Sequence, residues 1–142
     1  MQNCIENVSD FFMCYKKAAW DKNVDVMVNL YHDKVLIFDM WGIQGFSSGL
    51  KEWSVIVMNW LTSLKEEKVN VTFDMIEINE GDNIAFASAL IKYEAISTEH
   101  IVLRSMRNRI SLGFVKTDGF WKVKHQHTSA PIDSDLKAIL DI

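Results

Sequence analysis

The chain has 142 residues, of which 49% are hydrophobic and 24% are charged, as expected for one globular domain with a substantial core. Its formal net charge of -4 argues against nucleic-acid binding, which normally requires a basic face. No apolar run approaches the roughly 20 residues of a membrane helix, and the N-terminus lacks the pattern of a signal peptide. We therefore expect a soluble, cytoplasmic protein with one domain over residues 1–142, and neither nucleic acid nor a membrane as a partner.

Two helices and a strand are predicted first. Ser9 is a candidate cap for an amphipathic helix, because apolar residues recur after it every three or four positions. This helix would contain both Cys4 and Cys14, about 15 Å apart along its axis, which is too far for a disulfide. Asn23 is a candidate cap for a second, short helix, and residues 35–40 are typical of a buried strand.

A longer helix and four extended segments follow. Either Ser47 or Ser48 would cap the third helix, whose apolar stripe continues to about Leu64. The chain then changes to extended apolar patterns between turn signals. Four strands are predicted there, at residues 69–78, 84–96, 101–116 and 120–128. The Thr-Asp-Gly turn at 117–119 would join the last two as a hairpin, and residues 134–142 could add a C-terminal helix.

Helices followed by strands indicate an α+β fold with a mostly antiparallel sheet. Three helices lying on a curved antiparallel sheet would leave a cone with an apolar pocket inside it. Such pockets are where small domains of this kind most often bind a ligand. Trp41 and Trp60 would give a ligand apolar walls, and the alternative interpretation of both is ordinary core.

Two histidines form an H-x-H motif in the last predicted strand. Side chains alternate along a strand, so His125 and His127 would share the buried face with Trp121 and Val123. A metal site would need at least a third convergent ligand, for which the spacing gives no candidate. We expect no metal and no cofactor. The histidines either are satisfied by partners in the core or contact a polar group of a ligand.

The register of the last hairpin decides which residues lie beside the histidines. If Thr-Asp-Gly is a three-residue loop, Arg109 and Ser111 face the two histidines and join them in a polar corner of the pocket. A one-residue slip brings Ile110 and Leu112 there instead, because it reverses every side chain. The sequence leaves both registers open.

The order of the elements and the end of the chain resemble the SnoaL-like branch of the nuclear transport factor 2-like superfamily. The most specific motifs are R-x-S at Arg109 and Ser111 and the segment KTDGFWKVKHQHTS at 116–129, which is similar to the D-G-x-W and H-x-H-x-S ending of that branch. The resemblance covers about residues 8–131. It implies a cone-shaped, cystatin-like α+β barrel, often a homodimer packed sheet to sheet, and a small apolar, polyketide-like or steroid-like ligand.

The start of the chain, over residues 14–42, is similar without gaps to bacterial ketosteroid isomerases. That similarity implies Tyr15 as the tyrosine that stabilises an oxyanion and Asp39 as the base that shuttles a proton. The chemistry is coherent, since an apolar cone raises the pKa of a carboxylate and a phenol there donates a strong hydrogen bond to developing charge. The third isomerase residue, a protonated aspartic acid, corresponds to about Ser111, which is a weaker donor.

Two hypotheses for the function therefore stay open. In the first, the protein is an isomerase, cyclase or dehydratase with Asp39 as acid or base and Tyr15 as oxyanion donor. In the second, it is a non-catalytic ligand-binding or protein-interaction domain, in which Tyr15 belongs to the core and Asp39 caps the following loop. The expected ligand contacts are Trp41, Trp60, Arg109, Ser111, His125 and His127.

Overall fold

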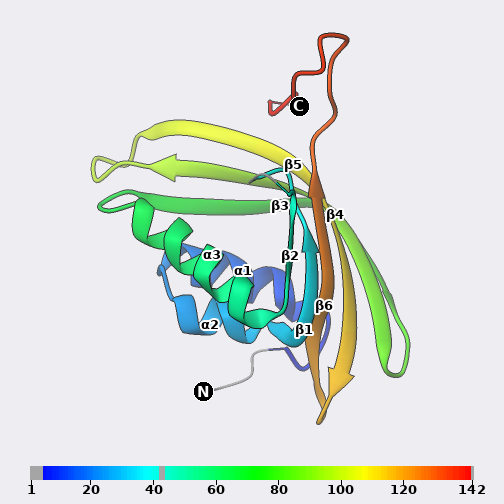
Figure 1. Ribbon diagram of the computed structural model, residues 1–142. Helices are drawn as coiled ribbons and strands as arrows, with labels where there is room; N and C mark the ends of the chain where they lie inside the picture. The colour runs from blue at the N-terminus through cyan, green and yellow to red at the C-terminus, as the bar shows by residue number, and fades with distance from the viewer. Residues whose placement is uncertain (1–4, 42–43, 142) are drawn as a thin grey trace.

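The computed structural model of the protein describes residues 5–41 and 44–141. Within these residues, three helices lie on the inner side of a curved, six-stranded sheet that does not close (Figure 1). The helices are α1 (Asp10–Trp20), α2 (Val24–Asn29) and α3 (Leu50–Ser63). The strands are β1 (Tyr31–Phe38), β2 (Phe46–Ser48), β3 (Lys68–Glu80), β4 (Ile84–Ile96), β5 (Val102–Thr117) and β6 (Phe120–Ser129). The predicted α+β cone is confirmed.

The strand order across the sheet is β2-β1-β6-β5-β4-β3. The four long strands β3 to β6 pair with their sequence neighbours as antiparallel hairpins. In contrast, β1 runs parallel to β6, and the short β2 pairs antiparallel with β1 at the edge. The sheet is therefore mixed, and it departs from the antiparallel prediction only at the β1 and β6 pair. This pairing places the end of β1 beside the end of β6.

Of the predicted helix caps, only some are present in the structure. The side chain of Asn23 accepts a hydrogen bond from the backbone N–H of Val26, as predicted for the cap of α2. Ser9 occupies the N-cap position of α1 but makes no side-chain capping bond. The prediction that Ser47 or Ser48 caps α3 is wrong, because both lie in β2 and Gly49 holds the N-cap with a φ of 88°.

Aromatic residues of α1 form the centre of the core. The ring of Phe11 meets Phe114 of β5 edge to face, with 5.5 Å between centroids. Phe12 meets Phe73 of β3 in the same way at 4.9 Å. Edge-to-face pairs of this kind contribute about 0.5–1.5 kcal/mol beyond the area they bury. These contacts fix α1 against the inner face of the sheet.

A β-bulge in β6 corrects the expected position of the histidines. The loop of the last hairpin is only Asp118 and Gly119, and Phe114 lies opposite Val123. Gly113, the residue before Phe114 in β5, lies opposite His125, so Lys124 is an extra residue in β6. Beyond a bulge, every side chain of the strand changes face.

The inner, buried positions of β6 are consequently Trp121, Val123, Gln126 and Thr128. His125 and His127 lie on the outer face, and the prediction that they share the buried face with Trp121 and Val123 is wrong. Neither predicted register is present, since Ser111 lies opposite His127 and Arg109 lies opposite Ser129.

The chain after β6 is not the predicted C-terminal helix. It leaves the body of the molecule and turns back on itself (Figure 1), with one isolated bridge between Ile132 and Ala138. The carboxylate of Asp133 accepts hydrogen bonds from the N–H groups of Asp135 and Lys137, which holds this turn. Such side-chain bonds compete with a helix.

Two further observations concern the N-terminal residues and the helices. Cys4 lies outside the described residues, and α1 begins only at Asp10, so α1 does not contain both cysteines. In the part of the chain that the structure describes, no helix has the length and apolar character needed to cross a membrane.

Candidate ligand site in the cone

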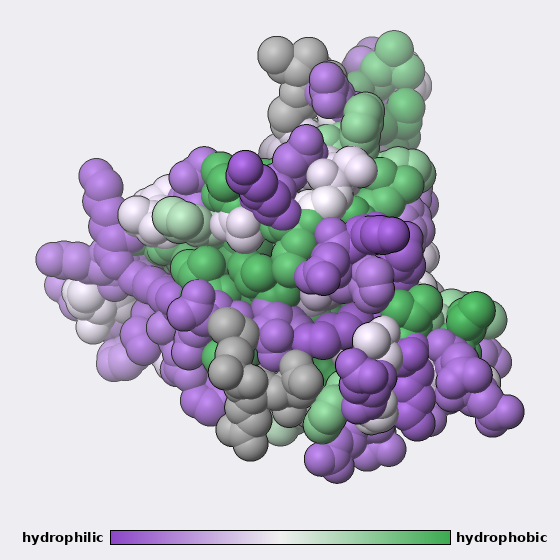
Figure 2. All heavy atoms as spheres, turned by 60° about the horizontal axis from the view of Figure 1, so that its bottom comes forward, coloured by the Kyte–Doolittle hydropathy of each residue, from purple (hydrophilic) through white to green (hydrophobic). Residues whose placement is uncertain are grey.

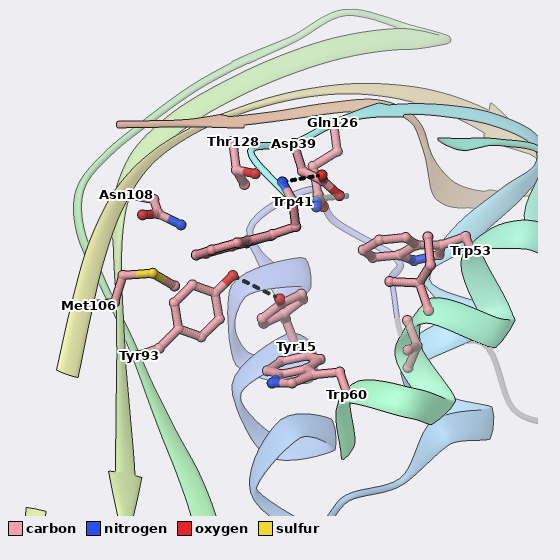
Figure 3. A pocket seen from close by; sticks show the side chains of 12 residues that line it. Tyr15, Asp39, Trp41, Trp53, Trp60, Tyr93, Met106, Asn108, Gln126 and Thr128 are labelled. Carbon is pink, nitrogen blue, oxygen red and sulfur yellow. Dashed lines mark hydrogen bonds between the residues drawn. The ribbon is translucent and has the colours of Figure 1, made fainter. Parts of the chain in front are cut away.

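A cavity of about 410 Å³ lies between the helices and the inner face of the sheet (Figure 3). Side chains from most of the elements converge on it, and the helix side is aromatic. From α1, from the end of β1 and from α3 it is lined by Tyr15, Asp39, Trp41, Trp53, Ile56, Val57 and Trp60. From β4, β5 and β6 it is lined by Tyr93, Met106, Asn108, Gln126 and Thr128. The cavity is within the usual size range for a small-molecule pocket.

Two tyrosines form a hydrogen-bonded pair in this cavity. The hydroxyl oxygens of Tyr15 and Tyr93 are 3.2 Å apart, and either can be the donor (Figure 3). Removal from water raises the pKa of Tyr15 well above its ordinary value and raises the pKa of Tyr93 to about 12. Both phenols therefore keep their protons at neutral pH. Because the pair uses only one of its two protons internally, the other is available to a ligand.

Asp39 follows β1 and holds the start of the next loop. Its Oδ1 accepts a hydrogen bond from the backbone N–H of Trp41 at 2.9 Å, and its own N–H donates to the carbonyl of Gly45 at 2.8 Å. The bond from the N–H of Trp41 to Oδ1 closes an Asx turn. Among the described residues, none donates a hydrogen bond to Oδ2, the second carboxylate oxygen. Oδ1 of Asp39 therefore caps the loop, as one of the two hypotheses predicts, and Oδ2 accepts no hydrogen bond from the described residues and is open to a ligand.

The sheet side of the cavity carries buried amides. Gln126 is 3% exposed, and its Oε1 accepts a hydrogen bond of 2.6 Å from the hydroxyl of Tyr31. Asn108 is 2% exposed, and its Oδ1 has no hydrogen-bond partner in the described structure. The indole N–H of Trp53 is unpartnered in the same way. Because an unsatisfied buried polar group is costly, these two atoms mark positions where a ligand could supply the missing partner.

The structure brings together four of the eight predicted site residues. Tyr15, Asp39, Trp41 and Trp60 all line the cavity. Their roles toward a ligand stay predictions, but the residues lie where both hypotheses need them.

The other four predicted residues lie together on the outer face of the sheet instead. Arg109 donates from Nε to the hydroxyl of Ser129 at 3.2 Å, and Ser111 lies opposite His127. The Nδ1 of His125 is 2.7 Å from the carbonyl oxygen of Leu36 in β1. The bulge in β6 is the cause, because it turns the histidines outward. Among the described residues, no cluster of three or more histidine, cysteine or acidic side chains could hold a metal.

Four cavity residues with polar side-chain atoms were missed by the sequence reasoning: Tyr93, Asn108, Gln126 and Thr128. Two of them had a signal, since Tyr93 shares an alternating face with Ile91, and Asn108 shares one with Ile110. Gln126 and Thr128 carried no such signal, because the bulge at Lys124 decides which face of β6 their side chains lie on.

A curved open sheet wrapped around three helices, with a cavity inside, defines the cone-shaped α+β fold of the nuclear transport factor 2-like superfamily. The sequence matches the SnoaL-like domain family over residues 8–133. The chain belongs to that family. Among curated protein sequences, none matches this chain.

Solved structures show the same fold at low sequence identity. A nuclear transport factor 2-like protein of unknown function from Pseudomonas putida has a TM-score of 0.83 and 18% identity, with 95% of this chain and 92% of that chain covered. A nuclear transport factor 2-like superfamily protein from Salmonella enterica has a TM-score of 0.68 and 16% identity, with 89% of this chain and 90% of that chain covered. A candidate scytalone dehydratase from Novosphingobium aromaticivorans has a TM-score of 0.74 and 11% identity, with 94% of this chain and 87% of that chain covered. At these identities the likeness concerns the fold alone.

Proposed function

We propose that this SnoaL-like protein binds a small, largely apolar molecule in the cavity of the cone. The observation that carries the proposal is the lining itself, in which aromatic walls meet a few convergent polar groups. That combination is typical of ligand pockets, where apolar area supplies affinity and a few polar atoms fix orientation. The cytoplasmic location predicted from the sequence belongs to the same proposal.

Filling the cavity tests this proposal. Ile56 lines the cavity from α3 and is 40% exposed, whereas its neighbour Val55 is 50% exposed and does not line it. We expect Ile56→Trp to weaken binding of apolar fragments at least about tenfold, because the larger ring occupies the ligand volume. The matched control Val55→Trp should bind like the wild type. Ligand-observed NMR with a fragment library measures both. Equal binding by the two variants, or no binding by the wild type, would contradict the proposal.

Catalysis in the same cavity is the second candidate, and the shared location of Asp39 and the Tyr15–Tyr93 pair favours it. In such a reaction Asp39 would take a proton from a carbon that lies between a carbonyl and a C=C double bond. The C–H electron pair would move into a dienolate, whose oxygen would accept a hydrogen bond from a phenol of the tyrosine pair. Return of the proton to the far carbon of the dienolate would shift the double bond into conjugation with the carbonyl and give the isomer. The ketosteroid isomerase-like pattern at Tyr15 and Asp39 and the dehydratase-like fold relative support this candidate.

A homodimer packed through the outer face of the sheet completes the proposal. Phe38, Phe46 and Phe86 are between 39% and 60% exposed on that face. The C-terminal segment adds Ile132 and Leu136, at 59% and 79% exposed. Hydrophobic side chains gather visibly on this segment (Figure 2). Exposed apolar surface of this kind is typical of protein–protein contacts.

A further inference from the structure

The charge of the cavity lining is one-sided. Asp39 is the only acidic residue among the twelve described lining residues, which include no lysine, arginine or histidine. The two phenols stay neutral because burial raises their pKa values. A carboxylate at the wall of an aromatic cavity favours a cationic partner, and an anionic ligand would meet a like charge with no basic side chain of the lining to offset it.

The cavity offers both open acceptors and open donors. Oδ2 of Asp39 accepts no hydrogen bond among the described residues, and the buried Oδ1 of Asn108 has no partner there either. The oxygen of Gln126 is already used by Tyr31. The indole N–H of Trp53 and one proton of the tyrosine pair are the open donors. A ligand that carries N–H groups as well as an acceptor atom can pair with both kinds, and a buried group left without a partner costs free energy.

The aromatic walls favour positive charge as well. Trp60 packs edge to face against Tyr93 with 5.8 Å between centroids, and lies 6.5 Å from Tyr15. The indole of Trp41 crosses the cavity above this group (Figure 3). The faces of aromatic rings carry negative charge density and attract ammonium groups, tryptophan most of all. A neutral apolar body would also pack here, but it would gain nothing from the carboxylate.

From these three observations we infer that the ligand of the cone is a protonated primary or secondary amine carried on an apolar body. The ammonium group lies between the Asp39 carboxylate and the aromatic faces, and the apolar body fills the remaining cavity. The unpartnered indole N–H of Trp53 suits one oxygen atom on that body. This inference rests on the proposed binding of a small molecule in the cavity.

Matched fragments that differ only in their end group test the inference. Tryptamine, tryptophol and indoleacetate share one ring system and carry an ammonium, a hydroxyl and a carboxylate, and phenyl and naphthyl sets repeat the comparison. With the purified full chain at neutral pH, we expect amines to bind at least about tenfold more tightly than the alcohols, and carboxylates to bind most weakly. Isothermal titration calorimetry and ligand-observed NMR measure the dissociation constants.

Two charge-removing variants locate the source of the preference. Asp39→Asn should lower the ratio of amine to alcohol affinity at least about fivefold, and its amide oxygen can still accept from the N–H of Trp41. Asp33→Asn removes the same charge from an exposed position of β1 and should leave the ratio unchanged. Amines that bind no more tightly than alcohols, or a preference that survives Asp39→Asn, would overturn the amine inference while leaving the cavity proposal intact. Absence of binding for every fragment would overturn both.

Discussion

The two oxygens of Asp39 have different surroundings. Oδ1 holds the loop by accepting from the N–H of Trp41, and Oδ2 accepts no hydrogen bond among the described residues. A structural role and a chemical role for this carboxylate are therefore compatible. Substitutions can separate the two, because asparagine keeps an oxygen for the loop and loses the base, whereas alanine loses both.

We accordingly predict different outcomes for Asp39→Asn and Asp39→Ala. Asp39→Asn should keep the free energy of unfolding nearly unchanged, whereas Asp39→Ala should lower it by about 1 kcal/mol through loss of the loop bond. If Asp39 is a base, both variants should slow enolisation of a bound ketone by a factor of roughly 100 or more. Urea denaturation measures stability, and NMR of deuterium exchange into β-tetralone in deuterium oxide measures enolisation.

The wild type gives the decisive control for the catalytic part of this prediction. Acceleration of exchange over the uncatalysed rate must appear before any variant is informative. If the wild type accelerates no ketone of an aryl and β,γ-unsaturated series, the base role of Asp39 is rejected, and the loop role measured by Asp39→Ala stands alone.

Individual cavity residues were predictable to the extent that local patterns fix their orientation. Tyr15 lies on the apolar stripe of a regular helix, and Asp39 directly follows a buried strand, so both could be placed from the sequence. Asn108 shares its face with Ile110, but its hydrogen-bonding state depends on which groups surround it in three dimensions. An unpartnered buried oxygen has no signature in the sequence.

At the scale of single elements, the first three helices and the long strands were predictable, whereas the C-terminal turn and the irregularities were not. The helix periodicity and the asparagine cap of α2 are local properties and were confirmed. The three-residue strand β2 was missed because its pairing with β1 is a non-local interaction. The bulge at Lys124 was missed because both hairpin registers considered beforehand assumed regular pairing beyond the loop.

Gly49 gives a prediction for the start of α3. Its φ of 88° and ψ of 153° are a backbone conformation that is almost restricted to glycine, although a Cβ would have room, with the carbonyl oxygen of Asp33 as its nearest neighbour at 4.0 Å. We expect Gly49→Ala to lower the free energy of unfolding by about 1–3 kcal/mol because of backbone strain alone. Urea denaturation followed by tryptophan fluorescence measures the change.

Gly113 provides the matched control for that substitution. It lies within β5, and a Cβ there would make an ordinary contact of 3.8 Å with the Cβ of His125. Gly113→Ala should therefore change stability by less than Gly49→Ala. A result in the opposite order would show that the conformation at Gly49 is not what restricts that position.

At the scale of the whole molecule, the sheet separates a helix-covered face from an outer face with exposed phenylalanines. If the outer face forms the dimer, Phe86→Glu should shift the protein from dimer to monomer, because Phe86 is 60% exposed on β4. Met13→Glu is the control, since Met13 is 74% exposed but lies on α1. Sedimentation velocity measures both. A monomeric wild type, or equal behaviour of the two variants, would contradict the dimer.

The bulge in β6 means that this strand contains two alternative linings for the cavity in one sequence. Gln126 and Thr128 face inward because Lys124 is an extra, unpaired residue, whereas His125 and His127 would face inward if Lys124 were paired regularly with a residue of β5. One additional residue in β5, placed opposite Lys124, would make the pairing regular and exchange an amide-and-hydroxyl wall for an imidazole wall, while leaving the hairpin turn itself untouched. Related chains with the same H-x-H ending can therefore place different chemistry in the same cone.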